Sequence, residues 1–139
     1  MYVRNLIIEI MKQVNINLAG GKVSWGFKTN NQTVAYYRAA LIDPNKPDPK
    51  DRVLKRWEHQ RTADNVPDHF EIPFEAAEIV GCHLWIQAVI FDPTYAGKNY
   101  TSEIAVAQNG NFILNESYPG SVPAGKGKAN GNTDEIVFI

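Results

Sequence analysis

The chain has 139 residues, of which 44% are hydrophobic and 21% are charged, the balance of a globular domain rather than of a disordered or fibrous chain. Fourteen Lys and Arg residues against fifteen Asp and Glu residues leave a net charge of −1, which disfavours non-specific binding of nucleic acid. The longest apolar stretch, residues 79–91, is shorter than the roughly 20 residues that a membrane-spanning helix needs. We therefore expect one domain over residues 1–139 that does not cross a membrane as a helix.

The sequence contains one cysteine, Cys82, which excludes an internal disulfide and a zinc site made of several cysteines. A lone cysteine fits a reducing compartment, and we expect this one to be a small buried hydrophobic residue. No secretory signal is predicted, because Glu9 interrupts the apolar residues 6–11 and no small-residue cleavage pattern follows. We expect cytoplasmic accumulation or release by a non-classical route.

Strand patterns fill the first third of the chain. Residues 3–10 carry Val, Leu and Ile at nearly alternating positions, and residues 14–18 alternate strictly between apolar and other side chains, which is typical of a half-buried strand. The pair Gly20-Gly21 predicts a turn. Two further strands are predicted at residues 23–27 and 33–42, joined by a hairpin-like connection at Asn30-Asn31.

The middle of the chain begins with a surface loop at residues 43–51, because its three prolines cannot donate to a strand ladder. Residues 53–59 predict a strand, with a short helix as the alternative. Residues 71–74 lead into Glu75-Ala-Ala-Glu78, which is one helical turn or a bend. Residues 80–91 are crowded with β-branched and aromatic residues and end at Asp92-Pro93, so they predict a central strand.

The last third predicts a hairpin, because residues 102–107 and 111–115 flank an Asn109-Gly110 turn. Residues 119–132 hold four glycines and two prolines and predict a flexible loop, followed by a final strand at 135–139. Eight to ten short strands separated by turns indicate an all-β fold, a single-domain antiparallel β-sandwich.

Charge is unevenly spread along the chain. Residues 62–97 contain no Lys or Arg, whereas five basic residues lie within the twelve positions before them: Lys50, Arg52, Lys55, Arg56 and Arg61. Both segments are interpreted as solvated faces. The alternative is a basic rim beside an acidic one, which would orient the protein on an anionic surface or a partner.

Catalytic motifs are absent from the sequence, which has no G-x-S-x-G elbow, phosphate-binding glycine loop, H-E-x-x-H pair or C-x-x-C. Cys82 and His83 are neighbours, and neighbours in a strand point to opposite faces, so they do not pair as nucleophile and base. The three histidines lack a local ligand spacing, and the acidic residues of 43–51 do not match a calcium loop. We therefore expect no enzyme, no cofactor and no metal.

Tyrosines gather in predicted loops, with Tyr95 and Tyr100 after the central strand and Tyr118 just before the glycine-rich segment. A tyrosine ring has an apolar body and a polar tip, which suits a lipid headgroup boundary or the face of a sugar. Lys98, which lies between two of them, or the basic residues of 50–61 would meet a phosphate. Trp85, inside the central strand, is expected to pack in the core.

Two stretches resemble the aegerolysin group of small β-sandwich proteins and, more loosely, the binary insecticidal proteins and actinoporin-type sandwiches. They are the predicted strands 6–10 and 13–18 running into Val23-Ser-Trp-Gly26, and the loop from Phe91 to Asn99. The resemblance implies a β-sandwich that binds membrane lipids, often as the targeting half of a two-component pore-forming system. The positions that match are Trp25, Asp92, Tyr95, Gly97, Asn99 and Tyr100.

The loop tyrosines and the resemblance together predict a non-enzymatic protein that recognises a membrane lipid headgroup and acts at a target membrane. The ligand-binding residues are predicted to be Trp25, Asp92, Tyr95, Gly97, Lys98, Asn99, Tyr100 and Tyr118. A second protein component of a toxin pair and a homo-oligomer stay open as partners. The alternatives are a lectin-like module that binds a glycan and a structural subunit of a larger assembly.

Overall fold

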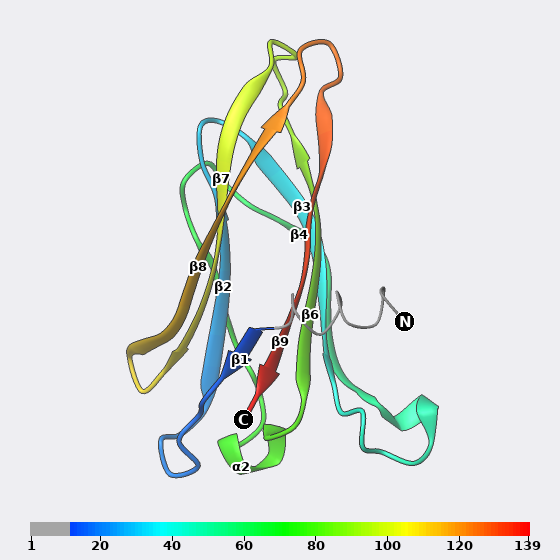
Figure 1. Cartoon of the computed structure of the whole chain (residues 1–139), viewed down its shortest axis with the longest axis vertical. Helices are drawn as coiled ribbons and strands as arrows, with labels where there is room; N and C mark the ends of the chain where they lie inside the picture. The colour runs from blue at the N-terminus through cyan, green and yellow to red at the C-terminus, as the bar shows by residue number, and fades with distance from the viewer. Residues whose placement is uncertain (1–11) are drawn as a thin grey trace.

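The computed structural model describes residues 12–139, apart from the side chains of residues 130–133. Within that part of the chain, nine strands form two sheets that pack face to face, so the expected all-β sandwich is confirmed (Figure 1). The strand expected at residues 3–10 lies outside the described residues.

One sheet has five strands in the order β1-β9-β6-β3-β4, and the other has four in the order β5-β2-β7-β8. A short 3₁₀ helix at Pro49–Asp51 and the single-turn helix α2 at Ala76–Ile79 lie in the connections. The strands are β1 Lys12–Val14, β2 Val23–Thr29, β3 Val34–Ile42, β4 Val53–Arg61, β5 Asp68–Glu71, β6 His83–Phe91, β7 Lys98–Gln108, β8 Asn111–Val122 and β9 Lys128–Phe138.

Most expected strands are confirmed, with shifted ends. The strand expected at 53–59 is β4, and the helical turn expected near Glu75 is α2. The strand expected at 14–18 is wrong beyond Val14: β1 pairs in parallel with β9 and then gives way to a turn at Asn17, where the backbone N–H of Gly20 donates to the carbonyl of Asn17. Every other pairing among the described strands is antiparallel.

The flexible loop expected at residues 119–132 is wrong, because β8 continues to Val122 and β9 begins at Lys128. Pro119 is tolerated because β8 is the edge strand of its sheet. Gly120 lies opposite Tyr100 in the register, and the ring of Tyr100 occupies the space where a Cβ of residue 120 would lie. Pro119 is thus compatible with an edge strand, and Gly120 leaves room for the Tyr100 ring. Only residues 123–127 form a loop.

The core lies between the sheets and follows the period of two along each strand. In β6, Leu84, Ile86, Ala88 and Ile90 face inward. Trp85 therefore faces outward under the guanidinium of Arg38, whose Cζ lies 5.4 Å from the ring, and the expectation that it packs in the core is wrong. Alternation forbids it, because its two neighbours in the chain are both core residues.

Cys82 and Trp25 both lie in the core, although the sequence predicts this only for Cys82. Cys82 is buried as expected, and burial, with Asp43 nearby, raises the pKa of its thiol to about 11. Trp25, expected to contact a ligand, is only 1% exposed; it packs against Trp57 and Phe70 with ring centroids 5.4 and 4.8 Å away. Its ring is therefore part of the core in this structure.

Four connections lie together at one end of the sandwich, at residues 30–33, 62–67, 92–97 and 123–127; we call this the loop end. The backbone N–H groups of Asp92 and Gly125 donate to the carbonyls of Gly127 and Tyr95, which ties the last two connections together at the top of Figure 1. The N–H of Gln32 donates to Asp64 Oδ1 at 2.8 Å, which ties the first two. No helix among residues 12–139 is long and apolar enough to cross a membrane.

Asp134 gives the fold an unfavourable buried charge. It faces the space between the sheets, its Oδ2 has no hydrogen-bond partner, and burial raises the pKa of the carboxyl while the Tyr118 hydroxyl opposes that change. A raised pKa in the folded state means that the group contributes stability at acid pH, and that this contribution is lost as the pH rises through the folded-state pKa.

We expect Asp134→Asn to increase the free energy of unfolding at neutral pH by about 1 kcal/mol, because it removes a buried carboxylate with an unsatisfied oxygen. The gain should vanish at acid pH, where Asp134 is protonated. Urea unfolding at several pH values measures both effects, with the exposed Asp51→Asn as the control. A loss of stability at neutral pH would contradict this account of Asp134.

Candidate functional site

The predicted ligand residues do not gather on one surface. Tyr100 is 8% exposed and faces the space between the sheets. Tyr118 is half-buried and faces the same space from β8, two residues before Gly120, the partner of Tyr100 in the register. Burial raises the pKa of both hydroxyls. The increase is larger for Tyr118, because the nearby Asp134 raises its pKa further. Of the three tyrosines, Tyr95 alone is well exposed, at 60%.

Asp92 organises the loop that follows β6. Its carboxylate is buried and accepts hydrogen bonds from the Thr94 hydroxyl at 2.6 Å, the Thr94 N–H at 2.9 Å and the Gly97 N–H at 3.0 Å. The pKa of Asp92 is lowered, first by the Thr94 hydroxyl and further by the two backbone donors and by Lys98. Gly97 has φ 87°, which favours glycine, so both residues shape the loop rather than meet a ligand.

Lys98 is occupied by contacts within the protein. Its Nζ donates to Gln32 Oε1 at 3.2 Å and lies 3.7 Å from Asp92 Oδ1, and most of its side chain is buried. The ammonium group therefore links the 30–33 and 92–97 connections and does not point to solvent, where a phosphate would meet it.

Tyr95 forms part of an exposed apolar surface on the outer side of the five-stranded sheet. Its ring packs on Gly127, and a cavity of about 580 Å³ lies beside it. Tyr36, 46% exposed, and Phe91 meet edge to face with ring centroids 5.1 Å apart. We call this the tyrosine surface; its apolar residues are Val34, Tyr36, Val89, Phe91, Pro93 and Tyr95.

Two exposed cations border the tyrosine surface. The guanidinium carbon of Arg61 lies 5.7 Å from the centroid of the Tyr36 ring, and Lys128 lies at the start of β9. The acid among the lining residues is Asp92, which is buried and paired with Lys98. The surface thus combines exposed aromatic rings with a local excess of positive charge.

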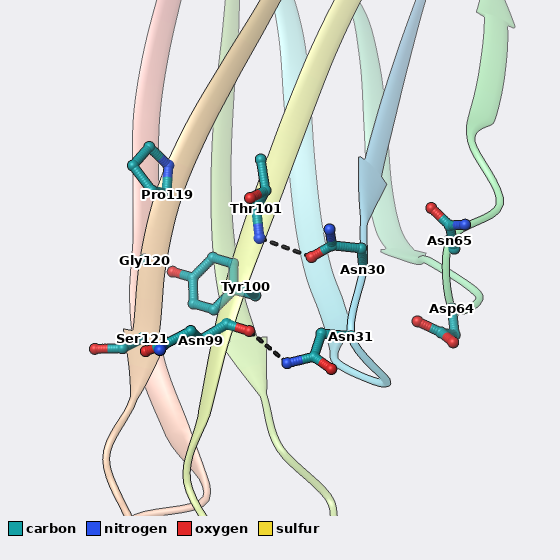
Figure 2. A pocket seen from close by; sticks show the side chains of 10 residues that line it. All are labelled: Asn30, Asn31, Asp64, Asn65, Asn99, Tyr100, Thr101, Pro119, Gly120 and Ser121. Atoms are coloured by element: carbon teal, nitrogen blue, oxygen red, sulfur yellow. Dashed lines mark hydrogen bonds between the residues drawn. The ribbon is translucent and has the colours of Figure 1, made fainter.

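A second, polar depression of about 980 Å³ opens at the same end of the molecule, beside the four-stranded sheet (Figure 2). It exists because β2 pairs with β7 only from Ser102 onward, so β7 and β8 continue beyond the end of β2. We call it the asparagine groove; its residues are Asn30, Asn31, Asp64, Asn65, Asn99, Tyr100, Thr101, Pro119, Gly120 and Ser121.

Two amides of the asparagine groove are held by the backbone of β7. Asn30 Oδ1 accepts a hydrogen bond from the Thr101 N–H at 2.7 Å, and Asn31 Nδ2 donates to the carbonyl of Asn99 at 2.6 Å (Figure 2). These bonds join the β2–β3 turn to a strand far away in the sequence. The sequence predicts only a turn at Asn30-Asn31, and the one local signal for Asp64 and Asn65 is their place between predicted strands.

Three of the residues considered as metal ligands have partners within the protein. His83 Nδ1 lies 3.3 Å from Glu135 Oε1, and in the 43–51 loop Asp43 and Asp48 accept hydrogen bonds from the N–H groups of Asn45 and Lys50. Within residues 12–139, no three His, Cys, Asp or Glu side chains are placed to hold a metal ion.

Comparisons of the chain with protein-family models, with curated proteins and with solved structures gave no match. The resemblance to the aegerolysin group therefore rests on the quoted residues alone. Of the positions that carry it, Tyr95 and Asn99 are exposed, Gly97 is half-buried, and Trp25, Asp92 and Tyr100 are buried.

We expect Asp92→Ala to disorder the loop at 92–97, because the N–H groups of Thr94 and Gly97 lose their acceptor. Hydrogen exchange should become faster at the Gly97 amide. In the unchanged protein, the lowered pKa predicts that protection persists on acidification below the ordinary range of Asp, near pH 4, and is lost at still lower pH. Asp48→Ala, which removes a similar side-chain bond to a backbone N–H at the other end of the molecule, is the matched control and should leave Gly97 unchanged.

Proposed function

We propose that the protein is a non-enzymatic module that recognises membrane lipid headgroups through the tyrosine surface. The observation that carries this proposal is the pairing of the exposed Tyr36 and Tyr95 rings with the bordering cations Arg61 and Lys128. Tyrosine suits the boundary between headgroup and acyl chain, and the two cations would meet lipid phosphate.

The set of contact residues in this proposal differs from the set predicted from the sequence. Tyr95 is retained as a contact residue, and Asp92 and Gly97 position its loop. Lys98 is mostly buried and joins that loop to Gln32. Trp25, Tyr100 and Tyr118 contribute to packing between the sheets. Tyr36 and Phe91 are added, because the pairing of β3 with β6 brings their rings together.

Affinity of a single copy for a membrane would be weak. Each cation near an anionic surface contributes about 1 kcal/mol of binding free energy, and burial of a small aromatic patch adds only a few kcal/mol. Stable binding would then need several copies, or a second protein bound beside it, so that avidity raises the apparent affinity. A targeting component of a two-component pore-forming or insecticidal toxin would meet that requirement.

We expect the double variant Tyr36→Thr/Tyr95→Asn to lower the partition coefficient onto vesicles at least about tenfold, because two rings no longer enter the interface. Thr suits a strand, and Asn tolerates the left-handed backbone of residue 95, which has φ 59°, so the fold should be retained. Flotation with phosphatidylcholine vesicles containing phosphatidylserine measures the partition.

Phe112→Ala is the matched control for this variant, since Phe112 is 71% exposed in the β7–β8 hairpin at the opposite end of the molecule (Figure 1). It should bind vesicles like the unchanged protein. If the unchanged protein floats with no vesicle composition tried, or if Phe112→Ala weakens binding as much as the double variant, the proposal is wrong.

Positive charge should contribute separately. Arg61→Gln/Lys128→Gln should reduce binding to phosphatidylserine-containing vesicles about tenfold or more at low salt, and the difference should shrink as salt screens the surface. Lys50→Gln/Arg56→Gln removes two other exposed cations outside the tyrosine surface and serves as the control. Equal losses in the two double variants would show that only overall charge matters.

A further inference from the structure

We propose that the asparagine groove binds a neutral carbohydrate, at a site distinct from the tyrosine surface. The site lies beside the other sheet of the sandwich, and seven of its ten residues are Asn, Asp, Ser or Thr. Its ligand needs no membrane, so this inference does not depend on the proposed lipid binding.

Hydrogen bonds to the backbone decide which amide atoms face the ligand. A backbone N–H can only donate, so the atom of Asn30 that faces Thr101 must be its oxygen, and the NH₂ group stays free as a donor. A backbone carbonyl can only accept, so Asn31 presents its NH₂ to Asn99 and keeps its oxygen free as an acceptor. Within residues 12–139 neither free atom has another hydrogen-bond partner. Asn30 therefore contributes a free donor to the groove and Asn31 a free acceptor.

Further polar groups extend this pattern across the groove. Asp64 is exposed, and its Oδ1 accepts the Gln32 N–H, so Oδ2 stays available as a further acceptor. The exposed side chains of Asn65, Asn99 and Ser121 lie around it. A sugar hydroxyl both donates and accepts, so a surface that offers donors as well as acceptors suits the neighbouring hydroxyls of a pyranose ring.

Charge selects against anionic ligands. The ten residues of the groove include no Lys or Arg and one acid, Asp64. A phosphate or an acidic sugar would meet the Asp64 carboxylate without a cation to offset the repulsion. The groove therefore favours a neutral ligand, which separates it in chemistry from the cation-bordered tyrosine surface.

Size and shape set the expected affinity. A volume of about 980 Å³ is at the upper end of ordinary ligand sites and accommodates a disaccharide. Pro119 offers one small apolar face, and the Tyr100 ring is mostly buried, so no broad aromatic platform is available for stacking. We expect dissociation constants of about 1 mM, as for a site that relies on hydrogen bonds exchanged with water.

The groove is held in shape before a ligand arrives. Asn31 and Gln32 both have left-handed backbone conformations, with φ 56° and 58°, as the tight hairpin turn between β2 and β3 requires. Asp64 and Lys98 hold Gln32 from two sides. A preformed site loses little entropy on binding, which offsets part of the cost of desolvating so many polar groups.

Chemical-shift titration of the ¹⁵N-labelled full chain tests the inference. The probes are lactose, maltose, cellobiose and diacetylchitobiose, with sialyllactose as the anionic comparison, each up to about 20 mM. We expect saturating shifts for at least one neutral probe at the side-chain amides of Asn30 and Asn65 and at the backbone N–H of Thr101. No saturating shift with any neutral probe, shifts confined to other surfaces, or tighter binding of sialyllactose at the groove would overturn it.

The variant Asn99→Ala/Thr101→Val removes two polar side chains of the groove and leaves the carbonyl of Asn99 and the N–H of Thr101, which hold the turn, in place. It should weaken sugar binding at least about fivefold. Asn115→Ala/Ser117→Ala, on the neighbouring strand outside the groove, is the matched control and should change binding less than about twofold. Equal weakening by both variants would overturn the assignment.

The tyrosine-surface variant separates this inference from the proposed lipid binding. Tyr36→Thr/Tyr95→Asn should bind the same sugar with unchanged affinity while failing to float with vesicles. If it also lost sugar binding, the two surfaces would be one site and the inference of a separate carbohydrate site would be wrong.

Discussion

Burial of one face of every strand between the two sheets is the constraint on which the rest of this structure depends. Along β6 and β7 the side chains alternate without interruption, so Leu84, Ile86, Ile104 and Val106 face inward, in the same core cluster as Trp25. Since the period is two, each inward residue fixes its neighbours outward. Trp85 on one sheet and Thr101 on the other face outward for this reason. The outward residues of both candidate surfaces are therefore set by which residues the core buries.

A small number of polar side chains hold the connections of the loop end together by hydrogen bonds. Asp92 closes the 92–97 connection with three hydrogen bonds, and Lys98 joins that connection to Gln32 in the β2–β3 turn. The turn is anchored in its other half by Asn30 and Asn31 on β7. The two surfaces therefore share a support of hydrogen-bonded connections but differ in chemistry. The tyrosine surface is aromatic and bordered by two cations, and the asparagine groove is polar with a single acid.

Local patterns in the sequence located most strands, and their failures have definite physical causes. Residues 119–132 are rich in glycine and proline, which ordinarily indicates a loop, but an edge strand accepts Pro119 and the Tyr100 ring needs the bare backbone of Gly120. The resemblance predicts Trp25 as a ligand residue, and its place in a predicted loop adds to the same prediction for Tyr100, but both are buried. Nothing in the sequence states which of the two faces of a strand meets the opposite sheet.

The sequence by itself determined the all-β class, the hairpin at Asn109-Gly110, the burial of Cys82 and the position of Tyr95 in a loop after the central strand, because alternation and turn chemistry are local properties of the chain. The tertiary structure alone decided that Tyr36 and Phe91 meet beside Tyr95, and that Asn31, Asp64 and Asn99 share one groove. Those neighbours depend on strand register and on which connections gather at the same end. Both are settled by packing between residues far apart in the chain.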